Sequence, residues 1–454
     1  MRTISLTMPR TSPLNKTLLV FSCALTACGA PLSSGGAAPD AAETDVPVAT
    51  PERPLAPDVS ASTTPDVAPD TIARDGGADR DTRAEAGVPF DVVDVARPED
   101  RPVPLDVRPD VPAARGWTLR AHPCPGTNRT DALHVDDEGT LWVGCGSGAE
   151  GAGLFRGSSD GATWGQLRDS SAGVLSAFRV SSIERGYDGA LYVGGYHSGT
   201  RTMALRVDTR ATPPTVESIL VGVPRLGSNF HVGTLRVRRD GTALAESLTG
   251  ADLLWRPASA TGATGWTDVR ETWSTDGAVR QMLDLVTLGD RFVGCGSTIA
   301  SSPYVFLPVT AAGAAPYRMT PLVLSSTWTG ELWGVTASAA RVVAVGVDQR
   351  NSRGKILVSG ADPHQLAGWR ETSLDAVLGT TRRTWARGVC MRGDRIVAVG
   401  EHGNTGIVVE STDGGDTWRD ITPTGVSGTV SKCVIRADGT LVVAGSAGMV
   451  GFYR

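Results

Sequence analysis

From residue 131 onward, one pattern of polar and apolar positions returns along the chain. A turn containing Asp or Gly is followed by a short apolar run that ends, in most copies, in a small residue, as in DEGTLWVG and GDRIVAVG. Such a fixed period is typical of a modular array of repeated units. The seven copies end at Gly144, Gly194, Glu246, Gly294, Gly346, Gly400 and Gly445, at intervals of 50, 52, 48, 52, 54 and 45 residues.

Each repeat has room for four short strands. An apolar strand precedes the turn, a second follows it, a third comes after a loop rich in Gly and Ser, and a fourth starts near an aromatic residue. Four short antiparallel strands per unit, separated by frequent turn signals, indicate a β-propeller. The residues expected at the start of the fourth strands are Trp164, Trp266, Tyr317, Trp369 and Trp418.

The two ends of the array complement each other. The last copy stops at MVGFYR, its third strand, whereas the array is preceded by GWTLR at residue 116, which has the form of a fourth strand. The sequence therefore predicts an all-β, seven-bladed propeller of four-stranded blades over residues 116–454. We expect the N-terminal strand to complete the last blade, because closure removes an open sheet edge. Six blades and a separate sheet are the alternative.

Composition divides the chain at about the same place. All eleven Trp lie from Trp117 onward, while residues 29–115 contain 13 Asp, 4 Glu and 8 Arg, a net charge of −9. Such an acidic, Pro-rich segment cannot bury enough apolar area to offset the entropy of ordering it. Residues 28–115 are therefore expected to form a disordered tether, with a docking motif as the alternative. The rest is nearly neutral, which gives no reason to expect a nucleic-acid partner.

The N-terminal residues 1–27 have the features of an export signal. Arg2, Arg10 and Lys16 precede the apolar run TLLVFSCAL, which is too short to span a bilayer, and Met8 is an alternative start. The following LTAC, ending at Cys28, resembles the lipobox of bacterial lipoproteins. That resemblance implies cleavage before Cys28 and its acylation, hence a membrane partner through a lipid anchor. An ordinary secretory signal is the alternative; both export the protein.

The residue after Cys28 bears on the expected location. It is Gly29 rather than Asp, which under the enterobacterial sorting rule favours the outer membrane. We therefore expect a protein anchored to the outer membrane or cell surface, with the periplasmic face also open.

Two polar loops share a second motif. STDGGDTW resembles the Asp box of neuraminidase-type (BNR) repeats, and SSDGATW is the same motif shortened by one residue. Asp can accept hydrogen bonds from its own loop, Gly supplies a positive φ, and Trp buries a large surface. We expect structural turns on the outer rim, away from any site. The matching residues are Ser411, Asp413, Gly415, Thr417 and Trp418, and Ser158, Asp160, Gly161, Thr163 and Trp164.

Taken over residues 116–454, the chain resembles BNR propellers and the photosystem II assembly-factor propellers. The second resemblance implies a non-catalytic binding or scaffold role. The alternative is a secreted glycosidase of sialidase type, which would need three clustered arginines, a Tyr–Glu pair and an acid/base Asp. The FRIP-like element of that family is missing, and no common hydrolase or phosphate-loop motif is present. A third hypothesis is that the chain is a structural cell-surface protein.

A ligand site is expected where the blade-to-blade loops meet the loops between second and third strands. Arginine and aromatic side chains there suit anionic or carbohydrate groups and protein hot spots. Arginine is also simply the usual cation of this chain, because Lys occurs only three times. Trp333 and Trp385 start first strands and are expected in the core. The candidate ligand-face residues are Arg129, Arg225, His231, Trp273, Arg280, Trp328, Arg382 and Arg383.

The remaining expectations concern partners, cofactors and cysteines. An envelope protein or a glycan is the expected ligand of a monomer, and no cofactor or metal is expected, since the calcium-loop ladder of acids is absent. An exported domain can keep disulfides. Strand positions favour Cys124–Cys145 and Cys390–Cys433, and leave Cys295 free.

Overall fold

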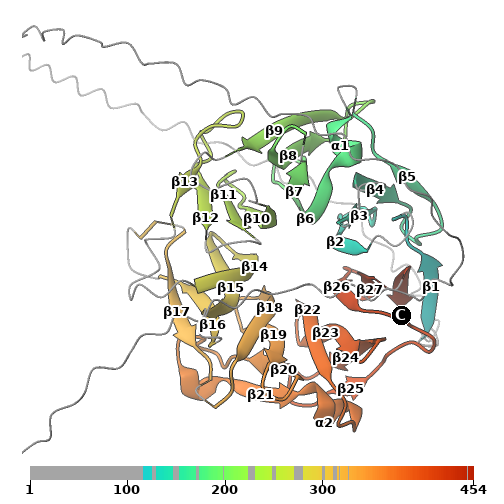
Figure 1. Ribbon diagram of the computed structural model, residues 1–454, viewed down its shortest axis with the longest axis vertical. Helices are drawn as coiled ribbons and strands as arrows, with labels where there is room; N and C mark the ends of the chain where they lie inside the picture. Colours follow the sequence, from blue (N-terminus) through green and yellow to red (C-terminus); the bar gives the residue numbers. More distant parts are fainter. Residues whose placement is uncertain are drawn as a thin grey trace, which may run out of the picture. The chain divides into compact units, whose positions relative to one another are not determined.

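The predicted propeller is confirmed by the computed structural model. In the described part of the chain, 28 strands form seven four-stranded antiparallel sheets arranged as blades of a ring (Figure 1). All described residues belong to one compact unit. The predicted signal peptide, Cys28 and the tether lie outside the described residues. Those residues are 116–124, 129–146, 153–169, 173–197, 199–222, 231–247, 252–269, 280–298, 302–309, 314–315, 317–325, 327–446 and 448–454.

The first three blades follow one another along the chain, each running outward from its first strand. They comprise β2 (Thr130–Val135), β3 (Leu141–Cys145), β4 (Gly153–Gly157) and β5 (Trp164–Gln166); β6 (Arg179–Arg185), β7 (Leu191–His197), β8 (Thr202–Asp208) and β9 (Thr215–Val221); and β10 (Val232–Val237), β11 (Ala243–Ser247), β12 (Leu253–Arg256) and β13 (Thr267–Asp268).

Blades four to six repeat this order. They comprise β14 (Arg280–Leu288), β15 (Arg291–Thr298), β16 (Pro303–Pro308) and β17 (Met319–Val323); β18 (Gly330–Ala337), β19 (Val342–Asp348), β20 (Arg353–Val358) and β21 (Arg370–Ser373); and β22 (Thr384–Arg392), β23 (Arg395–His402), β24 (Thr405–Ser411) and β25 (Arg419–Asp420).

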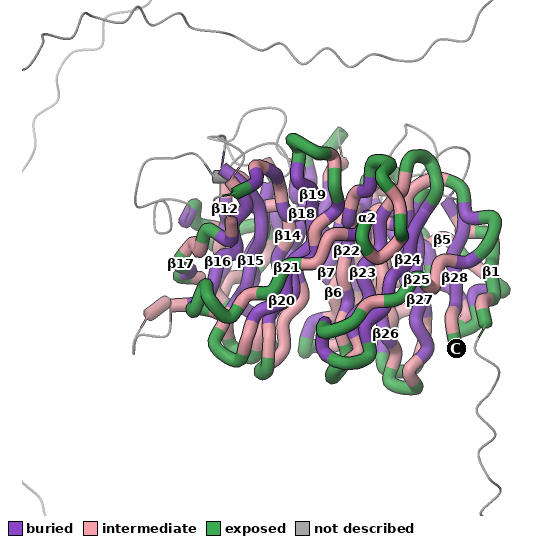
Figure 2. The backbone as a smooth tube through the Cα atoms, turned by 90° about the horizontal axis from the view of Figure 1, so that it is seen from below, coloured by how far each residue is buried: buried purple, intermediate pink, exposed green. Residues whose placement is uncertain are grey.

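Helical structure in the described residues is confined to short connections. These are α1 (Val174–Ala177), α2 (Leu374–Leu378) and a 3₁₀ turn (Leu366–Gly368). No helix among the described residues has the length and apolar character that crossing a membrane requires. Figure 2 shows that the strands are mostly buried and that exposed residues gather at the turns.

Blade 7 joins the two ends of the propeller chain. It contains β26 (Val430–Ile435), β27 (Leu441–Gly445) and β28 (Met449–Tyr453), and its outer strand is β1 (Trp117–Ala121). β1 pairs antiparallel with β28, from Trp117 opposite Tyr453 to Ala121 opposite Met449. The indole N–H of Trp117 also donates to the carbonyl of Ile421 in blade 6, at 2.6 Å. The N-terminal strand therefore closes the ring, as predicted.

Apolar side chains hold neighbouring blades together. Each of the seven buried clusters found among the described residues takes its members from two consecutive blades. Val343 and Ile356 of blade 5, for example, pack with Ala398 and Val409 of blade 6. A sheet buries both faces only when flanked on both sides, so each blade depends on two neighbours. Removing apolar surface from water at every interface is the main stabilising term of the ring.

Two disulfides flank blade 7. Cys390 of β22 bonds Cys433 of β26, and Cys124, which follows β1, bonds Cys145 at the end of β3. The first therefore joins blade 7 to blade 6, and the second joins the segment after the closing strand to blade 1. Cys295 is free and buried. The blade assembled from both chain ends is thus covalently tied on both sides.

We expect removal of either disulfide to lower the free energy of unfolding. The sequence separations are 43 residues for Cys390–Cys433 and 21 for Cys124–Cys145. Loop-closure entropy gives about 4 and about 3 kcal/mol respectively. Urea unfolding of the two double Cys→Ser variants measures both losses, with Cys295→Ser as the control that keeps both bonds. Unchanged midpoints in both double variants would contradict this account of the seam.

One buried acid interrupts the repeat. Glu246 in β11 takes the position that Gly144 and Gly194 hold opposite the first strands of blades 1 and 2. It is fully buried, and neither carboxylate oxygen has a hydrogen-bond partner among the described residues. Burial raises the pKa of the Glu246 carboxyl well above its ordinary value, and the nearby Asp284 carboxylate adds to the rise. Burial without a partner therefore disfavours the charged form of this side chain.

Because its folded pKa is raised, Glu246 costs stability progressively as pH rises above the unfolded value of about 4.3. We expect Glu246→Gln to raise the free energy of unfolding near neutral pH by about 1–3 kcal/mol. The gain should shrink at acid pH, where both states of the native side chain are neutral. Denaturation at several pH values measures it, with the exposed Glu138→Gln as control. A gain that does not depend on pH would contradict the assignment.

Candidate functional site

The first strand of every blade carries the same irregularity. One extra residue interrupts the pairing with the second strand, for example between Thr130 and Ala132 in β2. Such a β-bulge leaves the extra residue unpaired and redirects its side chain. The seven inserted residues are Asp131, Ser181, Gly233, Leu283, Trp333, Arg387 and Ser431.

All seven bulge residues line one cavity of about 280 Å³. These residues lie near the starts of the first strands, which surround the central channel of the ring. The cavity is therefore at the end of that channel where the blade-to-blade connections lie. We call it the channel mouth. Its other lining residues are Arg129, Thr234, Thr429, Lys432 and Ser446.

The bulges also explain a glycine at the end of the repeat. A Cβ added to Gly400 would lie 1.9 Å from the carbonyl oxygen of Trp385, and one added to Gly346 would lie 1.9 Å from that of Glu331. Each carbonyl belongs to the residue two places before a bulge. At these two positions, in blades 5 and 6, only glycine permits this approach of the two backbones, whereas the repeat-ending Gly144 of blade 1 faces the side chain of Val180 instead.

An arginine held between two tryptophans forms the wall of the mouth at blades 5 and 6. The Arg387 guanidinium carbon lies 3.8 Å from the ring centre of Trp333 and 4.4 Å from that of Trp385. The two indoles meet edge to face, with centres 5.2 Å apart. Trp333 donates its indole N–H to Glu331 at 2.8 Å. The guanidinium is thereby fixed in position before any ligand arrives.

Glu401 holds the other side of this guanidinium. Its Oε1 accepts from Arg387 Nη2 at 2.6 Å and from Nε at 3.2 Å, while its Oε2 accepts from the hydroxyl of Thr429. Burial lowers the pKa of Arg387, Glu401 opposes that shift, and nearby Arg129 adds to it. Arg387 and Arg129 are thus like charges that the fold keeps close to each other.

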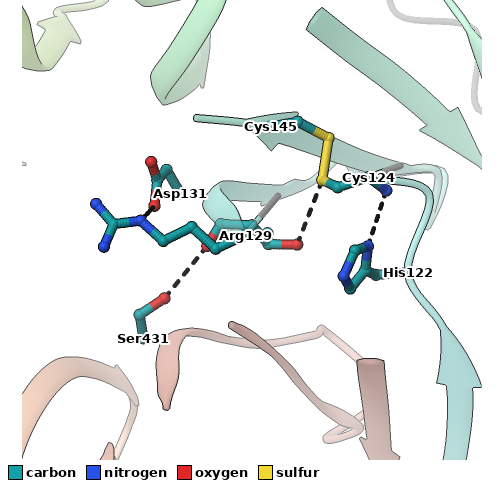
Figure 3. The surroundings of a disulfide bond; sticks show 7 residues. His122, Cys124, Arg129, Asp131, Cys145 and Ser431 are labelled. Atoms are coloured by element: carbon teal, nitrogen blue, oxygen red, sulfur yellow. Dashed lines mark hydrogen bonds and ion pairs between the residues drawn. A yellow bond between two sulfur atoms is a disulfide. The ribbon is translucent and has the colours of Figure 1, made fainter. Parts of the chain in front are cut away.

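Further charges come from blades 1 and 7. Arg129 Nε lies 2.6 Å from Asp131 Oδ1 (Figure 3). Burial raises the pKa of Asp131, an effect that Arg129 and Lys432 oppose. Lys432 forms no ion pair with the described residues. The lining therefore contains three cations and one acid, and the cations belong to the adjacent blades 6, 7 and 1.

The Cys124–Cys145 disulfide supports this cationic side. Figure 3 shows it beside Arg129 and Asp131. The Cys124 amide donates to His122 Nδ1 at 2.8 Å, and Cys124 Sγ contacts the hydroxyl of Thr130 at 3.8 Å.

The opposite side of the mouth, from blades 2 to 5, is uncharged and carries hydroxyl, glycine, leucine and tryptophan residues: Ser181, Gly233, Thr234, Leu283 and Trp333.

A larger cavity, of about 960 Å³, opens at the other end of the first strands. Its arginines are mostly paired: Arg185 with Asp136 at 2.9 Å and Arg238 with Asp240 at 3.2 Å. Burial raises the pKa of Glu184 to about 7, and its carboxylate accepts from the Val237 amide at 2.7 Å. Five acids and three arginines line this cavity, so it lacks the group of cations that marks the channel mouth.

The structure brings only some of the predicted ligand-face residues to the mouth. Arg129 lines it, whereas Arg382 and Arg383 are exposed but do not. His231 stacks on Tyr196 with ring centres 4.4 Å apart, and burial lowers its pKa. Arg225 and Trp273 lie outside the described residues, as does the side chain of Arg280.

The expectation for Trp328 was wrong. Its side chain is 5% exposed, packs between blades 4 and 5, and donates to Glu371 Oε2 at 2.9 Å. Trp333 and Trp385 were expected in the core and are instead half-buried beside the channel. Sequence reasoning also missed Arg387 and Lys432. The signal that could have found Arg387 is its place in the strand: TWARG puts it where the bulges recur.

The loop 411–418 is a self-contained turn between β24 and β25. Asp413 Oδ1 accepts from the hydroxyl of Ser411 at 2.8 Å and from the amide of Thr417 at 2.9 Å. The Thr417 hydroxyl, which donates to Oδ2 of the same carboxylate, contributes most to lowering the pKa of Asp413 to about 2, and these two bonds add to it. Gly415 has φ +92°, and an added Cβ would lie 2.8 Å from Val358 of blade 5. Trp418 packs against the interface of blades 5 and 6.

The loop 158–164 has a similar geometry in blade 1. The Ser158 hydroxyl donates to Asp160 at 2.6 Å, and the Ala162 amide donates to the same carboxylate at 3.1 Å. Gly161 has φ +66° and approaches Phe452 of blade 7, while Trp164 packs at that interface. Both loops lie between third and fourth strands. Among the described residues, no cluster of three or more His, Cys, Asp or Glu could hold a metal ion.

Comparisons with known proteins support the fold. No protein-family model and no curated protein matches the chain. Among solved structures, streptogramin B lyase matches with a TM-score of 0.52 and 11% identity, over 74% of this chain and 97% of that one. The Cps50 (Swd1) propeller of Myceliophteria thermophila gives 0.51, 9%, 74% and 98%. YCF48 from Cyanidioschyzon merolae gives 0.50, 13%, 74% and 98%. At these identities the likeness concerns the fold alone.

We expect Asp413→Asn to lower the melting temperature without affecting ligand binding, because the carboxylate serves only its own turn. The native pKa of Asp413 is depressed, so its contribution is present above pH ~4 and disappears as pH falls toward 2. The difference in melting temperature should therefore narrow over that range. Calorimetry of both proteins measures it, with Asp137→Asn as an exposed control. A constant difference would show that the charge is not responsible.

Proposed function

We propose that this chain is an exported, lipid-anchored binding propeller of Asp-box type. It acts as a monomer and uses the channel mouth to hold an anionic group of an envelope protein or glycan. Acylation at Cys28 would supply the anchor, and residues 28–115 the tether. A lipid anchor on one residue, combined with a long acidic spacer, would leave the ring free to meet its partner.

The observation that carries this proposal is the convergence of three cations in the lining of the channel mouth, two of them paired with Glu401 and Asp131 and the third, Lys432, without an ion pair among the described residues. Arg387 packs against Trp333 and Trp385; burial lowers its pKa, Glu401 opposes that shift, and nearby Arg129 adds to it. Holding like charges together costs free energy unless an anion offsets it. Lys432, which has no ion pair among the described residues, adds a third cation. The Ser431 and Ser446 hydroxyls beside it can bond the same anion.

The cysteines support export. The described structure contains two disulfides, and disulfides persist mainly in oxidising compartments such as the periplasm and the cell surface. A membrane-anchored protein facing such a compartment meets both proteins and glycans. A purely structural surface protein would have no need of a preorganised charged cavity.

The sialidase alternative finds little support in the lining of the mouth. Two arginines and one lysine converge there, and no tyrosine is among the twelve lining residues. The acid present, Asp131, is already paired with Arg129. The site holds an anion well but offers no nucleophile beside a base, which favours binding over catalysis.

The test uses the Cys28→Ser chain, which cannot be acylated, and its tryptophan fluorescence. Acidic oligosaccharides and acidic peptides are titrated, each with an uncharged analogue. We expect binding only of the acidic probes, with a fluorescence change because two indoles contact Arg387. The pair Arg387→Met and Lys432→Met should weaken binding at least about tenfold, or ~1.4 kcal/mol.

The matched control removes two exposed arginines from the opposite face, Arg239→Met and Arg392→Met. Equal losses in both double variants would show that net charge, and not the mouth, governs binding. Binding of no acidic probe would overturn the proposal. Turnover of a fluorogenic sialoside that the mouth variants abolish would establish the enzyme instead.

A further inference from the structure

Four exposed arginines gather on two neighbouring loops outside the channel mouth. Arg350 lies in the turn between β19 and β20 of blade 5, and Arg353 is the first residue of β20. Arg382 and Arg383 lie in the connection that leads into β22 of blade 6. Arg353 lies 3.2 Å from Asp375, and the other three form no ion pair with the described residues. We call this group the arginine patch. Its charge is largely free to meet a partner.

Hydrogen bonds hold the two loops together. The Thr384 amide donates to the carbonyl of Ser352 at 3.0 Å, and the Thr384 hydroxyl accepts from the Gly354 amide at 2.8 Å. These bonds join the connection to the turn that carries Arg350 and to the strand that begins with Arg353. The arginines of both loops therefore belong to one surface.

The same connection is also bound to the next turn of its own blade. Gly403 donates to the carbonyl of Arg383 at 3.1 Å, and the Thr380 hydroxyl bonds His402 Nε2 at 3.0 Å. The backbone beneath the patch is thus fixed on both sides. A partner would not have to order these loops on binding, which lowers the entropic cost of association.

The acids of these loops do not cancel the patch at the surface. Asp348 is buried and accepts from the Arg350 amide at 3.1 Å and from Asn351 at 2.8 Å. Asp375 is buried and faces Arg353. Both aspartates are buried, whereas the four arginines are exposed. An approaching surface therefore meets mainly positive charge.

The position of the patch distinguishes it from the channel mouth. The mouth is a recess at the centre of the ring, which admits one small group. The patch lies on turns at the ends of strands, where exposed residues gather (Figure 2). Side chains at the ends of loops can contact an extended flat surface. Residues inside a recessed cavity cannot.

We propose that the arginine patch docks the propeller on a membrane surface that carries anionic phosphate headgroups. Guanidinium groups bond phosphate oxygens in pairs, and clustered basic residues bind anionic lipid surfaces. The inference does not depend on the ligand of the channel mouth. One supporting argument rests on the proposed function: acylation at Cys28 would keep the patch near a membrane and raise the effective concentration of headgroups.

The experiment is co-sedimentation of the unacylated Cys28→Ser chain with vesicles. Phosphatidylcholine vesicles containing phosphatidylglycerol are compared with pure phosphatidylcholine. We expect sedimentation only with the anionic vesicles, and release by added salt. The triple variant Arg350→Gln, Arg382→Gln and Arg383→Gln should reduce the bound fraction at least about tenfold.

The matched control makes the same charge change on the opposite face, at residues that are also exposed: Arg239→Gln, Arg318→Gln and Arg392→Gln. It should bind vesicles like the parent chain, and so should the Arg387→Met, Lys432→Met pair. Equal losses in patch and control variants would overturn the proposal, as would absence of binding to anionic vesicles. A soluble sulfated glycan that binds the patch more tightly than the vesicles do would assign the patch to a polymer.

Discussion

The structure depends on apolar contact between neighbouring blades. Every cluster of buried side chains described in the ring belongs to two consecutive sheets, so no blade is stable by its own residues alone. A ring of this kind is as strong as its weakest interface. Blade 7 differs from the other blades because β1, from the far end of the propeller chain, completes it. Trp117 bonds blade 6, and one disulfide lies on each side of the blade.

One backbone device creates the candidate site. Each first strand carries a bulge at the same place, and the inserted residues meet around the channel. The fold thus presents seven positions whose geometry is constant and whose side chains are free to vary. In this chain the inserted residues of blades 6, 7 and 1 are Arg387, Ser431 and Asp131, beside which Lys432 and Arg129 also line the mouth, whereas blades 2 to 5 contribute no charged lining residue. The same blade 7 that closes the ring contributes Lys432 and the hydroxyls of the mouth.

Sequence and structure agree best where local chemistry decides. The turns with Asp and Gly, the apolar strands and the aromatic residues before the fourth strands all recur with the period of a blade, and each forms the expected element. The cysteine pairs also lie together, because strand order within blades determines which residues are neighbours. The sequence did not predict that the Glu246 carboxyl is buried without a hydrogen-bond partner. The repeat alone does not show whether a residue that replaces its glycine is buried.

The sequence by itself determined the number of blades, the order of their strands and the closure of the ring. These follow from turn chemistry and from alternation of apolar residues, which act over a few neighbouring positions. Only the tertiary structure decided which side chains face the channel. The side chain of Trp328, just before β18, is buried. The side chain of Trp333, within β18, lies beside Arg387 at the channel. A bulge shifts by one residue the alternation of side chains between the two faces of a strand. The pairing with the adjacent strand shows that shift, whereas the periodicity of the sequence does not.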